Sequence, residues 1–201
     1  MMVEEEIRLA LLDEMPIESR EFKDEVITGS MAHKVEFVSV RFERCRFVDC
    51  DFTGAGFYQT QLEKCDFSNC SFSGSYWKNC RITECKGNGS RFDKAVFKNM
   101  VLSESQLDLA NFGGSLFEGS KAEMCSFREA FFSEVRLKKT KFEKSDFTKV
   151  DFFRTSLRGM DFTDSVIESI MVSDTYREVA GMKINMFQAA EIAKLLGVTI
   201  V

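Results

Sequence analysis

One apolar position recurs at every fifth residue over most of this 201-residue chain. From Phe22 to Val172 the position holds a hydrophobic residue or glycine at 31 consecutive steps, and phenylalanine is its commonest occupant. A second position, two residues earlier in each unit, holds only Ser, Thr, Ala, Val, Ile, Met or Cys from Ser30 to Ile170. The two recurring positions account for most of the 21 Phe and for all 7 Cys. The cysteines are Cys45, Cys50, Cys65, Cys70, Cys80, Cys85 and Cys125.

A period of five fits neither a helix nor a long strand. In a helix of about 100° per residue, every fifth position advances by about 140° and the positions scatter around the axis. In a strand, an odd period moves the side chain to the opposite face at each repeat. A short extended segment followed by a corner keeps both positions on the inside. The sequence therefore predicts a solenoid, whose coils bury their apolar side by stacking on one another.

The five-residue units resemble those of the pentapeptide-repeat proteins, Ala-Asp-Leu-Xaa-Xaa. Examples are Cys50-Asp51-Phe52-Thr53-Gly54 and Ser145-Asp146-Phe147-Thr148-Lys149. The resemblance implies an all-β fold, a right-handed quadrilateral parallel β-helix with four units per coil, about eight coils and short terminal helices. Residues 20 apart should then stack. One expected ladder of rings is Phe52, Phe72, Phe92, Phe112, Phe132 and Phe152.

The two ends differ from the repeats, which divides the chain into three parts. We expect a capping segment over 1–21, the β-helix over 22–172 and a second cap over 173–201. A helix is predicted over 3–15, with Val3, Ile7, Ala10, Leu11 and Met15 near one face and Pro16 after its end. Asn185 is expected to cap a second helix over 186–196, and a short strand is expected over 198–201.

The second helix is apolar almost all round. Gln188, Glu191 and Lys194 form its one narrow polar strip. A helix of this kind needs cover on more than one side. The end of the solenoid can supply one side and a second copy of the chain the other, so we predict a homodimer through the C-terminus. The residues expected at this interface are Met186, Phe187, Ala190, Ile192, Leu195, Leu196, Val198 and Ile200.

The chain has few residues suited to catalysis. His33, the only histidine, follows an inward position and is expected on the surface, with no nucleophile or base spaced to act with it. The Cys-x4-Cys spacing equals one repeat, which favours thiols as small core residues over a metal site. We predict no catalytic residues, no metal and no cofactor, and the protein is expected not to be an enzyme.

Gly87 interrupts the apolar series in the segment 86–90. Two alternatives are open for it. Neighbouring side chains can fill the missing volume, or the segment can form a flexible loop that contacts a partner. The Lys86-Gly87-Asn88-Gly89-Ser90 sequence lacks the strand-to-helix context of a phosphate-binding loop.

The acidic excess of the chain lies outside the repeats. Residues 1–21 contain two basic and seven acidic residues, which equals the net charge of −5, and residues 22–172 contain 22 of each. One side of the solenoid is basic and stacks an outward apolar column, which is typical of a binding surface, although scattered apolar residues are also common on ordinary surfaces. The candidate partner surface consists of Tyr58, Tyr76, Val96, Leu116, Lys78, Lys98 and Arg136.

The C-terminal sequence resembles the quinolone-resistance (Qnr-type) branch of the same family. The similar segments are 181–190, which reads GMKINMFQAA, and 196–201, which reads LGVTIV. Membership would imply a dimer that binds DNA gyrase and topoisomerase IV as a DNA mimic and protects them from fluoroquinolones. The alternative is an interaction scaffold for an unidentified partner, without topoisomerase activity. In neither case do we expect a direct nucleic-acid partner.

The sequence shows no apolar run of about 18 residues, so no membrane partner or membrane span is predicted. The first residues are acidic where a signal peptide would be basic. We therefore expect a cytoplasmic protein with reduced cysteines.

Overall fold

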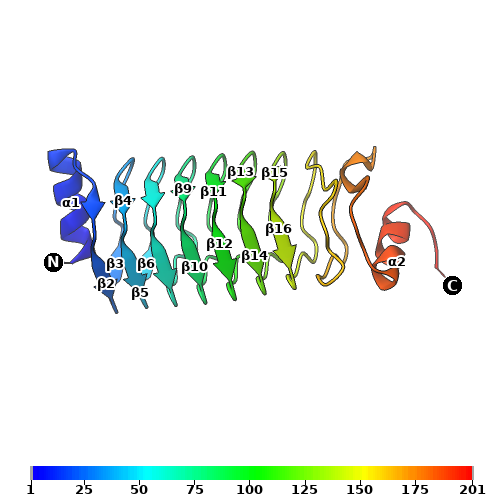
Figure 1. Cartoon of the computed structure of the whole chain (residues 1–201), viewed down its shortest axis with the longest axis horizontal. Helices are drawn as coiled ribbons and strands as arrows, with labels where there is room; N and C mark the ends of the chain where they lie inside the picture. Colours follow the sequence, from blue (N-terminus) through cyan, green and yellow to red (C-terminus); the bar gives the residue numbers. More distant parts are fainter. Residues whose placement is uncertain (1, 201) are drawn as a thin grey trace.

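The computed structural model describes residues 2–200, which form a rod of stacked coils with a helix at each end (Figure 1). The helices are α1 (Val3–Asp13), the 3-10 helix η1 (Arg177–Val179) and α2 (Met186–Leu195). The strands are β1 (Ile17–Glu18), β2 (Glu21–Lys23), β3 (Val26–Thr28), β4 (Glu36–Val38), β5 (Arg41–Glu43), β6 (Arg46–Val48), β7 (Gly56–Tyr58), β8 (Gln61–Glu63), β9 (Tyr76–Lys78), β10 (Arg81–Thr83), β11 (Val96–Lys98), β12 (Val101–Ser103), β13 (Leu116–Glu118), β14 (Lys121–Glu123), β15 (Arg136–Lys138) and β16 (Lys141–Glu143).

All strand pairs are parallel and join residues 20 apart in the chain. Two sides of the rod are seven-stranded sheets, in the orders β1-β4-β7-β9-β11-β13-β15 and β16-β14-β12-β10-β8-β5-β2. A short sheet of β3 and β6 and a series of isolated parallel bridges, such as Asp51 with Ser71, hold the other two sides. The predicted parallel β-helix with four units per coil is confirmed.

The strand-built part of the rod is slightly shorter than the eight coils expected. Six steps of 20 residues separate the first and last of seven strands, which makes about six turns. Beyond Glu143 both sheets end: residues 156–158 form no strand, and Asp161 pairs with Lys183 through a single bridge.

A corner residue with positive φ ends almost every five-residue unit. Examples are Gly54 (φ 69°), Lys64 (φ 54°) and Leu109 (φ 61°). This left-handed conformation turns the chain toward the next side, and it favours glycine because a Cβ is crowded there. Many corners nevertheless hold Lys, Glu or Asn, whose side chains point to solvent.

Both recurring apolar positions point into the rod. The predicted ring ladder is present, with Phe52 and Phe72 stacked at 5.0 Å between ring centroids and Phe92 and Phe112 at 5.2 Å. All seven cysteines are buried and free. The cysteines therefore pack the core, as the spacing indicates.

The segment 86–90 is a regular part of the coil. The Gly87 N–H donates to the carbonyl of Gln106 at 2.8 Å, and the Gly89 N–H donates to Asp108 at 2.8 Å. The ring of Phe67 occupies the volume that a side chain at Gly87 would need. Of the two alternatives, the structure therefore supports the filled volume and not the flexible loop.

The N-terminal helix is two residues shorter than predicted, because Glu14 adopts the left-handed conformation (φ 54°) and ends it. Val3, Ile7 and Ala10 are buried over the first coil. Leu11 and Met15 are exposed, contrary to expectation: Leu11 lies in α1 beside the buried Ala10, and Met15 lies beyond the end of the helix.

The C-terminal helix ends one residue before the predicted limit. The predicted cap is present. The Asn185 side chain accepts a hydrogen bond from the backbone N–H of Gln188 at 3.0 Å, and the Gln188 side chain accepts one from the backbone N–H of Asn185 at 2.8 Å. The strand predicted over 198–201 is not observed at residues 198–200, which have no regular secondary structure. Val201, the last residue of the predicted strand, lies outside the described residues.

Candidate protein-binding surface

The seven candidate partner-surface residues lie on one side of the rod. We call the outward side of the β1-to-β15 sheet the tyrosine face. Two columns run along it at residues one coil apart. The first is Tyr76, Val96, Leu116 and Arg136, and the second is Tyr58, Lys78, Lys98, Glu118 and Lys138. The aromatic and aliphatic residues of the first column are partly exposed, so the predicted outward apolar column exists.

Tyr58 packs closely on the tyrosine face because Gly56 has no side chain. A Cβ at Gly56 would lie 2.8 Å from the Tyr58 ring. The rings of Tyr58 and Tyr76 lie 5.7 Å apart. Partial burial raises the pKa of Tyr58, and the neighbouring carboxylate of Glu36 raises it further. The two tyrosines thus form one aromatic surface.

The cations of the tyrosine face have few acidic partners. Lys98 Nζ lies 3.7 Å from Glu118 Oε2 and 5.9 Å from the centre of the Tyr76 ring. Within residues 2–200, no carboxylate forms an ion pair with Lys78, Arg136 or Lys138. Their charge is therefore available to an external partner.

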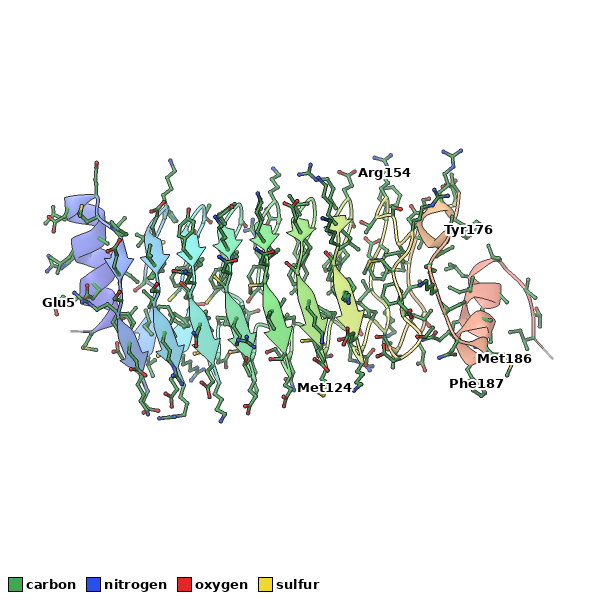
Figure 2. All side chains as sticks on the ribbon, in the orientation of Figure 1. Glu5, Met124, Arg154, Tyr176, Met186 and Phe187 are labelled. Carbon is green, nitrogen blue, oxygen red and sulfur yellow. The ribbon has the colours of Figure 1, made fainter. Side chains whose placement is uncertain are left out.

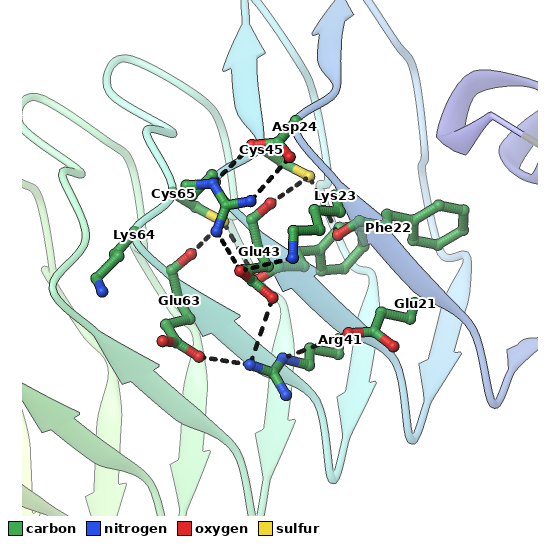
Figure 3. Close-up of polar contacts among 12 residues, drawn as sticks. Glu21, Phe22, Lys23, Asp24, Arg41, Glu43, Cys45, Glu63, Lys64 and Cys65 are labelled. Atoms are coloured by element: carbon green, nitrogen blue, oxygen red, sulfur yellow. Dashed lines mark hydrogen bonds and ion pairs between the residues drawn. The ribbon is translucent and has the colours of Figure 1, made fainter.

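The neighbouring side behaves differently. We call the outward side of the β2-to-β16 sheet the ion-pair face (Figure 3). Arg41 contacts Glu63 at 2.8 Å and Glu43 at 3.5 Å, and Arg44 contacts Asp24 at 2.6 Å. Hydrogen bonding to Arg44 lowers the pKa of Asp24, and hydrogen bonding to Lys23 lowers the pKa of Glu43. Most charges on this face are paired, whereas Arg81 and Lys141 have no ion-pair partner within residues 2–200.

The C-terminal helix rests on the last coil through its polar strip. Gln188 is buried and donates through Nε2 to the carbonyls of Phe162, at 2.7 Å, and Ser165. Met186 and Phe187 point away from the rod (Figure 2), with 80% and 82% of their surface exposed. The first turn of α2 therefore leaves two large apolar side chains open to solvent.

The predicted dimerisation residues divide into three groups in this chain. Met186, Phe187, Leu196, Val198 and Ile200 are exposed, and Ala190 and Leu195 are half-buried. Ile192 packs against the protein's own core, so this residue is less available to a second subunit than its position in the sequence suggested.

Sequence analysis missed one exposed aromatic pair. Phe131 and Phe153 project from successive coils on the same side of the rod, with 46% and 39% of their surface exposed. The guanidinium of Arg154, labelled in Figure 2, lies 4.9 Å from the centre of the Phe153 ring. The signal was present, because these are the two phenylalanines outside the five-residue series.

The structure separates the exposed His33 from the thiols, which are in the core. His33 is on the surface, with Nε2 3.0 Å from Asp51 Oδ2. Burial raises the pKa of the Cys80 and Cys125 thiols to about 11, which disfavours the reactive thiolate. Residues 2–200 contain no cluster of three or more His, Cys, Asp or Glu suited to a metal ion. Within the same residues, no helix is long and apolar enough to cross a membrane.

Two family profiles match the repeats. The one described as "Pentapeptide repeat region" matches residues 35–112, and the one described as "Pentapeptide repeats (8 copies)" matches residues 130–168. The chain belongs to the pentapeptide-repeat family. None of the curated proteins matches this pentapeptide-repeat protein significantly.

Solved structures of the family share its fold. A trypsin-treated form of QnrB1, described as a plasmid-mediated fluoroquinolone resistance protein, is 20% identical, with a TM-score of 0.58 over 93% of this chain and 100% of that chain. HetL, a pentapeptide-repeat protein involved in heterocyst differentiation regulation from the cyanobacterium Nostoc, is 12% identical, with a TM-score of 0.46 over 91% of this chain and 92% of that chain. At these identities, the likeness to QnrB1 extends to the fold.

Proposed function

We propose that this pentapeptide-repeat protein is a binding protein and not an enzyme. The observation that supports the proposal most is the tyrosine face, where an apolar column and unpaired cations stand side by side on a rigid sheet. Partly exposed aromatic residues flanked by charge are common at protein interfaces. The buried thiols and the isolated His33 agree with a role that needs no chemistry.

The first candidate partner is a type II topoisomerase, DNA gyrase or topoisomerase IV. The fold shared with QnrB1 and the Qnr-like C-terminal sequence favour it. The function would then be protection from fluoroquinolones. The charge pattern does not favour the DNA-mimic form of this hypothesis, because the repeats are neutral as a whole and the tyrosine face is basic.

Gyrase supercoiling in the presence of ciprofloxacin tests this candidate. We expect the wild-type protein, at micromolar concentration, to restore supercoiling, and Lys78→Glu with Lys98→Glu to reduce the rescue. Arg46→Glu with Lys86→Glu is the matched control, because both residues are exposed on the opposite side of the rod, in the column of Arg46, Asp66 and Lys86. If the protein at tens of micromolar neither rescues nor inhibits supercoiling, the topoisomerase function is excluded.

The second candidate is an interaction scaffold for another protein, again through the tyrosine face. The free charges of Lys78, Arg136 and Lys138 favour it, because they contrast with the paired charges of the ion-pair face. A protein that binds a partner through the tyrosine face without changing gyrase activity would have this function. The proposed location for either role is the cytoplasm.

The proposed binding protein is a homodimer joined through α2 and residues 198–200. Its support is the exposure of Met186 and Phe187 beside a helix whose polar strip is already used against the rod. Burial of two such apolar side chains stabilises an interface by several kcal/mol, about 1.5–3 kcal/mol for each fully buried side chain.

A further inference from the structure

The two columns of the tyrosine face have a spacing that selects the shape of a partner. Each coil places one residue in each column, and neighbouring strands lie about 4.8 Å apart. The distance from Lys78 to Lys138 along the rod is therefore about 14 Å, over three steps. Within residues 2–200 the one ion pair across this column joins Lys98 to Glu118, so Lys78 and Lys138 remain without an acidic partner.

We infer that the tyrosine face binds an acidic amphipathic helix of a partner protein, laid along the rod. A helix rises about 1.5 Å per residue, so positions i, i+3, i+7 and i+10 of one stripe lie about 0, 4.5, 10.5 and 15 Å along its axis. The column at Lys78, Lys98, Glu118 and Lys138 lies at about 0, 4.8, 9.6 and 14.4 Å. The two series agree to about 1 Å at every step.

An extended peptide fits the same column poorly. Side chains on one face of a strand recur at about 6.6–6.8 Å, so an extended chain loses register with the coils by the second step. A nucleic-acid backbone could pair with the lysines but has no group to cover the apolar column of Tyr76, Val96 and Leu116. The helix satisfies both columns with two adjacent stripes.

The charges also define the order of residues on the helix. Acidic residues at i, i+3 and i+10 of the partner helix would lie opposite Lys78, Lys98 and Lys138. Glu118 occupies the third place, so the residue at i+7 should be basic. Apolar side chains belong on the adjacent stripe, where they meet Val96 and Leu116.

Fluorescence anisotropy with a labelled synthetic helix of about 18 residues tests this inference. The probe carries acid, acid, base and acid at i, i+3, i+7 and i+10, with leucines on the adjacent stripe. A permuted peptide of identical composition and a DNA duplex of about 20 base pairs are the comparison probes. We expect the patterned peptide to bind at least about tenfold more tightly than the permuted one.

Two charge-reversed proteins locate the site. Lys78→Glu with Lys138→Glu should weaken binding of the patterned peptide by about tenfold or more. Arg46→Glu with Lys86→Glu, on the opposite side of the rod, should weaken it by less than about twofold. Unchanged melting temperatures would show that both variants fold. Val96→Asp should also weaken binding, which separates a helix with an apolar stripe from a purely electrostatic contact.

Three results would overturn the inference: no binding of the patterned peptide at about half-millimolar concentration, equal binding of the permuted peptide, or tighter binding of the DNA duplex with the same sensitivity to Lys78→Glu. The inference rests on the proposed binding function. The gyrase assay with ciprofloxacin uses neither peptide and is therefore independent of the titration. Rescue of supercoiling together with no peptide binding would refute the helix partner and leave the proposed binding function in place.

Discussion

The ring of Phe67 lies in the space that the side chain of Gly87 would occupy. A Cβ built on Gly87 would be 2.1 Å from Phe67 Cε2 and 2.8 Å from Leu107 Cδ2. Phe67 meets its neighbours Phe72 and Phe92 edge-on, whereas most rings of the ladder are stacked. The glycine and the phenylalanine in adjacent coils thus share one volume.

Gly87→Ala should destabilise the protein, because the ring of Phe67 would have to leave its position. Overpacking of a close-packed core costs about 1–3 kcal/mol. Urea unfolding would measure the loss. Phe67→Leu combined with Gly87→Ala should recover part of the stability, since the smaller side chain leaves room for the methyl group. An alanine variant as stable as the wild type would contradict the shared volume.

Gln188→Ala should loosen α2 from the rod. The substitution leaves the carbonyls of Phe162 and Ser165 without the amide that bonds them, at a cost of about 1–3 kcal/mol. Hydrogen exchange of the α2 amides should accelerate, while exchange in β9 to β13 stays unchanged, because a solenoid opens locally at its ends. Lys194→Ala is the control on the same helix. Equal protection of α2 in both variants would rule out this role for Gln188.

The protein should lose stability on acidification. In the folded state the pKa values of Asp24 and Glu43 lie below the ordinary values of these carboxyl groups. The two carboxylates therefore stabilise the fold at a pH above the ordinary values, and this stabilisation is lost as the pH falls through the lowered folded-state values. The melting temperature should therefore drop below about pH 4.5. Arg44→Gln should make this drop smaller, since it removes the main cause of the Asp24 shift. Identical pH profiles would argue against the ion-pair face as the source.

Phe187→Asp should convert the proposed dimer into a monomer. A carboxylate in the centre of an apolar interface would lose its hydration without a partner. Analytical ultracentrifugation at micromolar concentration would show the change. Phe131→Asp is the matched control, because Phe131 is also exposed but lies away from α2. A wild-type monomer at this concentration would refute the dimer.

None of the seven cysteines should react with Ellman's reagent at pH 8 in the folded protein. All are buried, which keeps the reagent away even from Cys50, whose pKa is lowered to about 7 by hydrogen bonding to Cys70. Burial raises the pKa of Cys80 and of Cys125 to about 11. Seven thiols should react once the protein is unfolded in urea. Rapid reaction of even one thiol in the folded state would show that the core admits solvent there.

The inward residues could be predicted because burial imposes the same demand at every repeat. Phe52 and Phe72 are equivalent positions, and their stacking follows from the period alone. The corners could not be predicted in the same way. Lys64 and Leu109 adopt the same left-handed conformation as Gly54. Their side chains are exposed, so no particular residue type marks the corner in the sequence.

The contacts of the surface side chains could not be predicted from the period. The period places Tyr76, Val96 and Leu116 in one column, but it cannot show that Lys98 already has a partner in Glu118 while Lys78 has none. The polar strip of α2 was visible in the sequence. The direction in which this strip faces could not be predicted, because Gln188 is buried through its hydrogen bonds to carbonyls of the coil beneath it.

The corner at every fifth residue also constrains how the length of the rod can change. An inserted unit of five residues would keep both inward positions and so preserve the core. Everything after the insertion would, however, be rotated by a quarter turn relative to everything before it. The tyrosine face would then break into two halves on different sides. Only insertions or deletions of 20 residues leave the surface aligned, so growth by whole coils conserves both packing and recognition, whereas growth by single units conserves packing alone.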